Sequence, residues 1–106
     1  MDVEAELLLA RAARVSGHEG RARVCARRAA GQAIRAHSGI EGDALKQLKW
    51  LAGSHAIPDS VRAAARRLST KVDPDHNLPF TEDPLEDARL IIAHLTPQPP
   101  LPTPPD

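Results

Sequence analysis

The sequence predicts an all-α protein, an up-and-down bundle of four longer helices and one short helix over residues 1–95. Apolar residues recur at three- and four-residue spacing in five segments, and no segment shows the period-two alternation of a β-strand. A loop with three prolines, residues 71–84, separates the fifth segment from the first four and stops either flanking helix from running through it. Residues 96–106 contain six prolines and no periodicity, so they are expected to form a disordered tail.

The first two helices are expected at residues 2–16 and 19–37, joined by a short turn into an antiparallel hairpin. The first has Asp2 as its cap and arginines in its last turn, and its apolar residues cover more than one face, which is typical of a central helix. The second has a stripe of small residues that permits close packing. Gly31 in its interior costs about 1 kcal/mol relative to alanine and therefore indicates a close contact at that position.

Three further helices follow from capping residues and periodicity. Asp43 caps a short helix over 44–54, and a fourth helix begins after Pro58 and runs to about residue 71. The fifth spans 84–95. Asp83 caps it, Pro84 fits the first helical position, and Glu86 completes a box-like cap.

Composition restricts the class of protein. Aliphatic residues supply nearly all the apolar mass, and Trp50 and Phe80 are expected in the core or, if exposed, as anchors of an interface. The single cysteine, Cys25, excludes an intrachain disulfide and is interpreted as a buried structural thiol. No signal segment and no membrane-spanning stretch is apparent, so a soluble cytoplasmic protein without membrane contact is expected.

The net charge is zero, but the charges are segregated. Residues 11–35 hold seven arginines and one acid, whereas residues 73–95 hold six acids and one arginine. Arg21, Arg28 and Arg35 share one face of the second helix with Gln32, and this face is the candidate surface for phosphate or a partner. The favoured interpretation is a solvated face, or one paired with acids near the proline loop (Asp73, Asp75, Asp83 and Asp87). Scarce aromatic residues argue against single-stranded nucleic acid as a ligand.

No cofactor or metal is expected. The closest approach to a ligand cluster is Asp73, Asp75 and His76, and a loop of solvated capping residues explains this group better.

The order of elements resembles the HEPN domain family. The resemblance rests on the Leu7–Val15 helix, a short turn, the Ala-rich run Ala22–Ala36, the leucine-rich helix Leu45–Leu51, and a proline-containing loop before the last helix. It implies a helical bundle that forms homodimers, binds a minimal nucleotidyltransferase as its partner, or does both. Within such an interaction module the candidate residues are Arg28, Arg35 and Gln32, with Asp73 and Asp75 as a matching partner surface.

Some members of that family are toxin ribonucleases marked by an arginine, four to six further residues and then a histidine. Arg89 and His94 match this spacing in the last helix, and Arg11 and His18 match it in the first turn region. In the last helix Leu90 replaces the usual polar residue, and five positions place two side chains about 140° apart around a helix. A non-enzymatic interaction module is therefore the favoured function. A metal-independent ribonuclease and a nucleotide- or phosphate-binding module are the alternatives.

Overall fold

A computed structural model describes residues 3–71 and 80–96, and this part of the chain is all-helical, without a β-strand. Its elements are α1 (Val3–Val15), α2 (Glu19–Ser38), α3 (Ala44–Ala52), α4 (Asp59–Ser69) and α5 (Pro84–Leu95). The predicted all-α class is confirmed, although α3 and α4 end slightly earlier than the sequence indicated. The expected cap Asp2, residues 97–106 of the predicted tail and the middle of the proline loop, which includes Asp73 and Asp75, lie outside the described residues.

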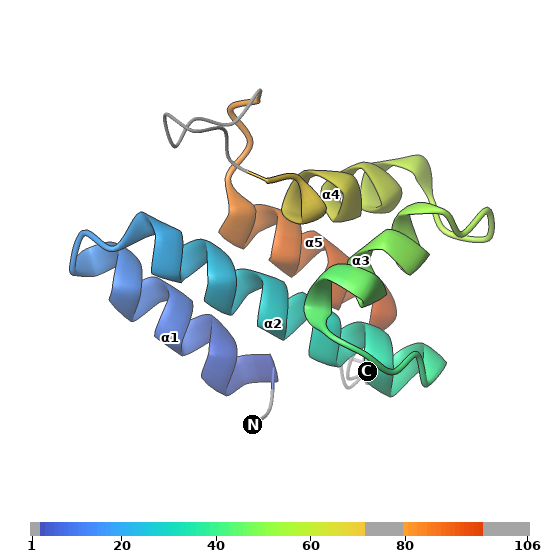
Figure 1. Cartoon of the computed structure of the whole chain (residues 1–106), viewed down its shortest axis with the longest axis horizontal. Coiled ribbons are helices and arrows are strands. Elements are labelled where there is room, and N and C mark those ends of the chain that lie inside the picture. The colour runs from blue at the N-terminus through green and yellow to red at the C-terminus, as the bar shows by residue number, and fades with distance from the viewer. Residues whose placement is uncertain (1–2, 72–79, 97–106) are drawn as a thin grey trace, which may run out of the picture.

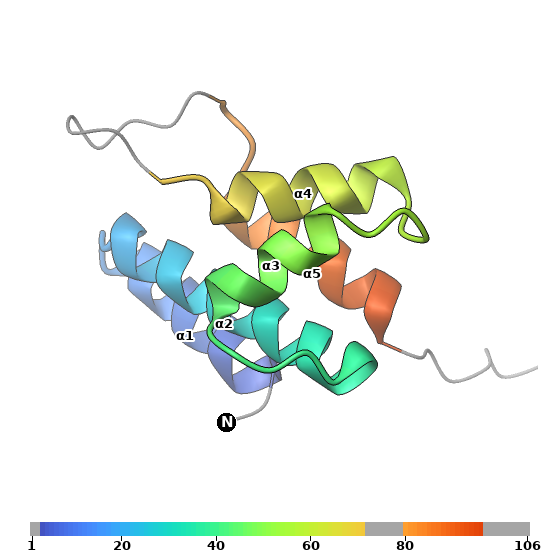
Figure 2. The same cartoon turned by 45° about the vertical axis from the view of Figure 1, so that its right-hand side comes forward.

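The second helix, not the first, is central. α2 packs against each of the other four helices, whereas α1 packs mainly along α2 and leaves its outer side uncovered (Figures 1 and 2). The expectation that α1 is central was wrong because its extra apolar residues do not face the core: Leu8 is 62% exposed and Val15 is 88% exposed. Along the chain α1, α2, α4 and α5 alternate in direction, and the short α3 crosses between α2 and α4 (Figure 1).

Small side chains allow the close packing around α2. Ala22, Ala26, Ala29 and Ala30 are fully buried on its inner face. Gly31 is equally tight, because a Cβ built there would lie 3.2 Å from Ala44 Cα and 2.5 Å from Gln47 Oε1 of α3. The close contact expected at this glycine is confirmed. Gln47 in turn donates from Nε2 to the Ile40 carbonyl at 3.0 Å, which fixes the α2–α3 connection.

Two of the predicted helix caps are confirmed in detail, and a third helix end is formed by a glycine. The Asp43 carboxylate accepts a hydrogen bond from the Lys46 N–H, and the Asp83 carboxylate accepts one from the Leu85 N–H with Pro84 at the start of α5. Gly39 ends α2 in the left-handed conformation, where its N–H donates to the Arg35 carbonyl. The predicted box-like cap at Glu86 was wrong, since that carboxylate accepts from the Arg89 side chain instead of reaching back to the start of the helix.

Arginines from α2 cap the end of α4 together with its own last residues. The Thr70 N–H donates to the Arg67 carbonyl at 3.2 Å, and the Ser69 and Thr70 hydroxyls donate to the Arg66 carbonyl. Arg23 donates from Nη2 to the carbonyls of Arg67 at 2.6 Å and Thr70 at 2.7 Å. Arg27 donates to the carbonyls of Leu68 at 2.7 Å and Thr70 at 3.0 Å. Burial lowers the pKa of both guanidinium groups. The negative end of the α4 dipole compensates for part of the cost of burying these charges.

One buried ion pair joins α4 to α5. Arg67 donates two hydrogen bonds to the Asp87 carboxylate, at 2.9 Å from Nε and 2.7 Å from Nη2. The Asp87 side chain is only 6% exposed, and this bidentate contact raises the pKa of Arg67.

Another arginine, Arg14, connects the ends of three helices. It donates two hydrogen bonds of 2.8 Å to Asp83 at the start of α5, and it also contacts Glu19 at the start of α2. Its hydrogen bonds hold the pKa of Asp83 below the ordinary value of 3.8. This contact therefore ties the α1–α2 hairpin to the helix after the proline loop.

Replacing Asp83 with asparagine is expected to destabilise the protein at neutral pH by about 0.5–1 kcal/mol, since the pair is partly exposed while an amide oxygen still caps α5. Because the folded-state pKa of Asp83 is depressed, the ion pair contributes fully above the unfolded pKa and is lost as pH falls through the folded pKa. Urea unfolding at neutral pH and below pH 3.8 measures this. The difference between wild type and Asp83→Asn should shrink in acid, and a constant difference would contradict the assignment.

Candidate functional site

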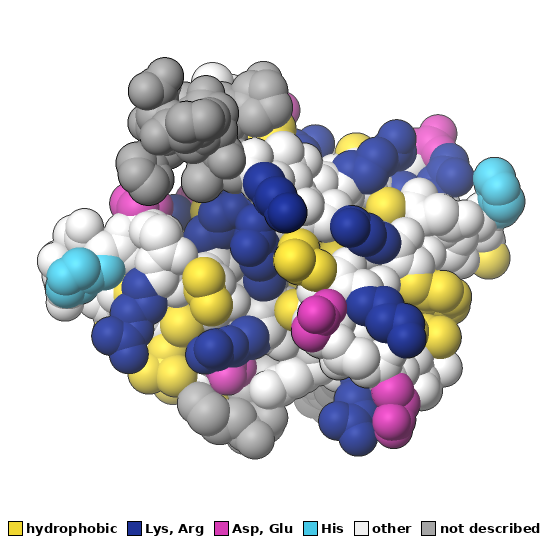
Figure 3. Space-filling model, in the orientation of Figure 1, with side chains coloured by type: hydrophobic (Ala, Val, Ile, Leu, Met, Phe, Trp, Pro, Cys, Tyr) yellow, Lys and Arg dark blue, Asp and Glu magenta, His cyan; other side chains and the backbone are white. Residues whose placement is uncertain are grey.

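Two of the sequence-predicted arginines border a shallow groove between α1 and α2. Arg21 and Arg28 line it together with Leu9, Gly20, Val24 and Cys25, and its volume is about 410 Å³. The floor is apolar and partly exposed, with Leu9 at 43% and Val24 at 41%. Figure 3 shows hydrophobic side chains gathered over this part of the molecule with Lys and Arg side chains around them.

The guanidinium groups of Arg21 and Arg28 are available for a ligand. Both residues are exposed, and neither forms an ion pair within the described part of the chain. The nearest acid along α2, Glu19, is already engaged by Arg14 at 2.8 Å. The groove therefore has an apolar floor and a border with uncompensated positive charge.

Arg35 and Gln32, the other two residues predicted on this face of α2, differ from Arg21 and Arg28 in their surroundings. Arg35 is exposed and lies 3.5 Å from the Glu41 carboxylate, so its charge is partly balanced. Gln32 is half-buried, and its Oε1 has no hydrogen-bond partner among the described residues. Neither lines the groove. The structure thus brings together Arg21 and Arg28 but assigns Arg35 and Gln32 to the continuation of the same helix face.

The outer side of α1 forms a second uncovered surface next to this groove. Leu8, Ala12 and Val15 are exposed along it, and Glu4 and Arg11 flank them. We call these five residues the α1 outer face. An apolar strip with one acid and one base at its edges is self-complementary in charge when two copies meet in opposite directions.

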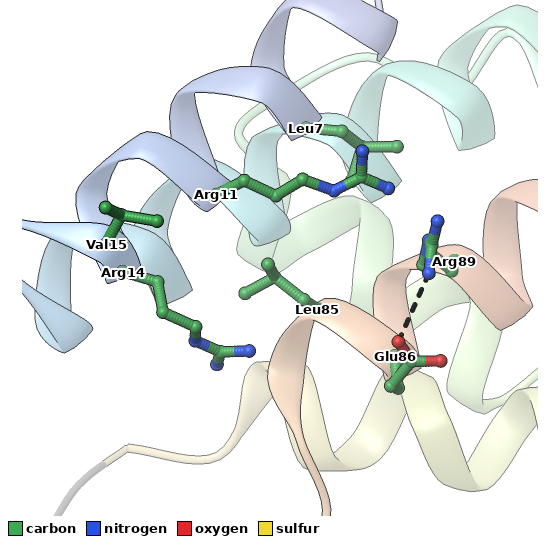
Figure 4. Close-up of a pocket in the computed structure, with 7 residues that line it drawn as sticks. All are labelled: Leu7, Arg11, Arg14, Val15, Leu85, Glu86 and Arg89. Atoms are coloured by element: carbon green, nitrogen blue, oxygen red, sulfur yellow. Dashed lines mark hydrogen bonds and ion pairs between the residues drawn. The ribbon is translucent and has the colours of Figure 1, made fainter.

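A second pocket, of about 330 Å³, lies between α1 and α5 and contains Arg89 (Figure 4). Arg11 and Arg89 point toward one another across it, over a floor that includes Leu7 and Leu85. Arg89 is held by Glu86 at 3.3 Å. His94 is exposed and is absent from the pocket lining. The structure therefore does not bring the candidate ribonuclease pair Arg89 and His94 into one site.

The acids that the sequence offered as partners for the arginine face are used elsewhere. Asp83 pairs with Arg14 and Asp87 pairs with Arg67. Asp73 and Asp75, the predicted partner surface, lie outside the described residues together with His76. Over residues 3–71 and 80–96, no group of three or more His, Cys, Asp and Glu side chains is arranged to hold a metal ion. In the same part, no helix is long and apolar enough to cross a membrane.

The single cysteine and the single tryptophan occupy different environments. Cys25 is a free thiol that is 3% exposed at the base of the groove, in agreement with the predicted buried thiol. Trp50 is 38% exposed on α3 and Phe80 is half-buried. Trp50 therefore meets the condition under which the sequence suggested an interface anchor, although it lies on another helix from the groove.

Sequence reasoning missed the arginines that hold the fold together. Arg14, Arg23 and Arg67 contact residues 69, 44 and 20 positions away, respectively, and periodicity carries no information on such contacts. One local signal was available. No glycine follows α4. Ser69 and Thr70 donate to the carbonyls of Arg66 and Arg67, but the Leu68 carbonyl still needed a donor from another part of the chain.

Comparison with protein-family models, with curated proteins and with solved structures found no match to this chain. The fold and the two uncovered surfaces define an all-helical protein with exposed apolar helix faces, and any functional assignment rests on these surfaces.

Proposed function

We propose that the chain is a non-enzymatic, HEPN-like helical interaction module that forms a homodimer and binds a partner of the nucleotidyltransferase type. The observation that supports this proposal best is the α1 outer face, whose apolar residues lie uncovered on an otherwise packed fold. Adjacent exposed apolar residues on a small domain are typical of surfaces that bind another protein. The HEPN resemblance adds the expectation of self-association and of the partner class.

The homodimer is assigned to the α1 outer face because that surface suits a two-fold contact. In an antiparallel pair of α1 helices, Leu8 would pack near its symmetry mate. Glu4 of one copy would lie near Arg11 of the other, and the Arg11 side chain would turn out of the α1–α5 pocket to meet it. A helix of 13 residues is about 20 Å long. One helix pair of this length buries less than the roughly 1,200 Å² of a stable interface, so a weak, concentration-dependent dimer is expected.

Light scattering coupled to size exclusion, over a wide range of protein concentration, tests self-association. Wild type is expected to shift from monomer to dimer, and Leu8→Glu should weaken the dimer at least about tenfold, because it places two carboxylates together at the two-fold axis. Leu90→Glu is the matched control, since Leu90 is a 41% exposed leucine on α5. A wild type that stays monomeric throughout, or equal loss of the dimer in both variants, would contradict the assignment to α1.

Of the alternatives, the ribonuclease has no supporting geometry, since Arg89 is paired with Glu86 and His94 lies outside the pocket that contains Arg89. The phosphate-binding alternative retains one favourable observation, the uncompensated Arg21 and Arg28 side chains. The apolar floor between these arginines argues for a ligand that is itself partly apolar.

A further inference from the structure

The groove between α1 and α2 is separate from the α1 outer face. Leu9 lines the groove, whereas the neighbouring Leu8 points about 100° away from it around the helix axis. The groove also includes Val24 and the edge of Cys25 from α2. A partner in the groove can therefore bind without occupying the surface assigned to the homodimer.

The border of the groove has a spacing that suits a helix. Arg21 and Arg28 are seven residues apart on α2, which places them about two turns, or roughly 10 Å, apart on the same face. Leu9 and Val24 lie on the floor between them. Acidic side chains one or two turns apart on a partner helix can meet both guanidinium groups, while its apolar side chains at three- and four-residue spacing contact the floor.

A second copy of this chain does not fit the groove. Symmetric use of the groove would set Arg21 and Arg28 of one copy against the same residues of the other, and like charges in contact weaken association. Single-stranded nucleic acid fits poorly as well, because the lining contains no aromatic side chain on which a base could stack. The positive charge at the border of the groove and its apolar floor together favour an occupant that is acidic and amphipathic.

We propose that this groove binds an acidic amphipathic helix of a protein partner, whose carboxylates pair with Arg21 and Arg28 and whose apolar side chains cover Leu9 and Val24. The inference rests on the proposed function as an interaction module, and it specifies the chemistry of the partner. Each exposed ion pair adds little affinity, so the charges mainly select the partner while the apolar contact supplies most of the binding free energy.

The test uses two synthetic helical peptides of about five turns with identical leucines at three- and four-residue spacing. One carries glutamates on both flanks of its leucine stripe, and the other carries lysines at the same positions. Fluorescence anisotropy with the full chain is expected to show at least about tenfold tighter binding of the glutamate peptide at low salt, and a smaller ratio at high salt. Equal binding of the two peptides would overturn the proposal.

A charge-reversal variant separates recognition from folding. Arg21→Glu combined with Arg28→Glu should lose the preference for the glutamate peptide and acquire one for the lysine peptide, which a merely unfolded variant cannot do. Arg66→Glu is the control, because Arg66 is an exposed arginine of α4 outside the groove, and it should behave as wild type. Unchanged peptide preference in the Arg21 and Arg28 variant would overturn the proposal.

Two further measurements distinguish this inference from the proposed dimer and from anion binding. Leu8→Glu, which should be monomeric, is expected to bind the glutamate peptide as wild type does. Absence of peptide binding by a wild type that still dimerises would overturn the inference and leave the proposed function intact. A single-stranded RNA that displaces the glutamate peptide at much lower concentration than the unlabelled peptide itself would favour a nucleic-acid ligand and would also overturn it.

Discussion

Replacing Arg67 with leucine is expected to destabilise the protein by about 3 kcal/mol, the range in which loss of one partner from a buried ion pair falls. The Asp87 carboxylate is 6% exposed and receives two hydrogen bonds from Arg67, at 2.9 and 2.7 Å. Without Arg67 this charge stays buried with no bidentate donor, and α4 loses its polar contact with α5. Urea unfolding followed by circular dichroism at neutral pH measures the change.

A double variant tests whether the cost comes from the orphaned charge. Arg67→Leu with Asp87→Leu should recover most of the lost stability, because replacing both partners by apolar groups leaves no unpaired carboxylate. Arg66→Ala serves as the control, since Arg66 is exposed on the same helix and should change stability by less than about 0.5 kcal/mol. A double variant that is no more stable than Arg67→Leu would argue that packing rather than charge explains the loss.

Replacing Arg23 with leucine should cost about 2–3 kcal/mol, because it removes the buried donor at the end of α4. Arg23 is 7% exposed, and it contributes hydrogen bonds of 2.6 and 2.7 Å to the carbonyls of Arg67 and Thr70. Loss of this donor leaves the Arg67 carbonyl with the longer 3.2 Å hydrogen bond from the Thr70 N–H, whereas the Thr70 carbonyl keeps its hydrogen bond from Arg27. The last turn of α4 should also exchange its amide hydrogens faster, because those carbonyls help to order it.

The matched control for Arg23 lies on the same helix. Arg28→Leu removes an arginine of α2 that is exposed and makes no ion pair among the described residues, so stability should change by less than about 0.5 kcal/mol. Amide exchange measured by mass spectrometry or NMR should show faster exchange confined to the end of α4 in Arg23→Leu. Uniformly faster exchange over all helices, or an equal effect of Arg28→Leu, would contradict a capping role.

The helices could be predicted because their information is local. The three- and four-residue spacing of Val61, Ala64, Ala65 and Leu68 defines the buried side of α4, and these residues are at most 3% exposed. Asp43 and Asp83 cap α3 and α5 as their side-chain chemistry requires. Helix arrangement depends on contacts between distant segments. The position of α1 was therefore misjudged, since nine apolar residues in thirteen do not reveal which of them face outward.

The candidate surfaces were predicted in part. The shared face of Arg21 and Arg28 follows from their spacing, and the structure leaves both side chains exposed at a groove. The apolar floor could not be predicted, because it combines Leu9 of α1 with Val24 of α2 and depends on how the hairpin closes. The number of arginines on α2 also overstates how many of them can bind a ligand. Of the arginines on α2, Arg23 and Arg27 donate hydrogen bonds to carbonyls at the end of α4 and are not available to a ligand.

The arginines that cap α4 have a consequence for how the sequence can drift. Arg23 and Arg27 bind main-chain oxygens at positions 67, 68 and 70, and every amino acid supplies such an oxygen. The residues just after α4 therefore do not need to include a glycine C-cap. Positions 23 and 27, far upstream in the sequence, must instead supply a long cationic side chain. Among descendants of this chain, selection should preserve arginine at positions 23 and 27. At positions 69 and 70 it should tolerate exchanges between serine and threonine, since either hydroxyl can donate to the Arg66 carbonyl.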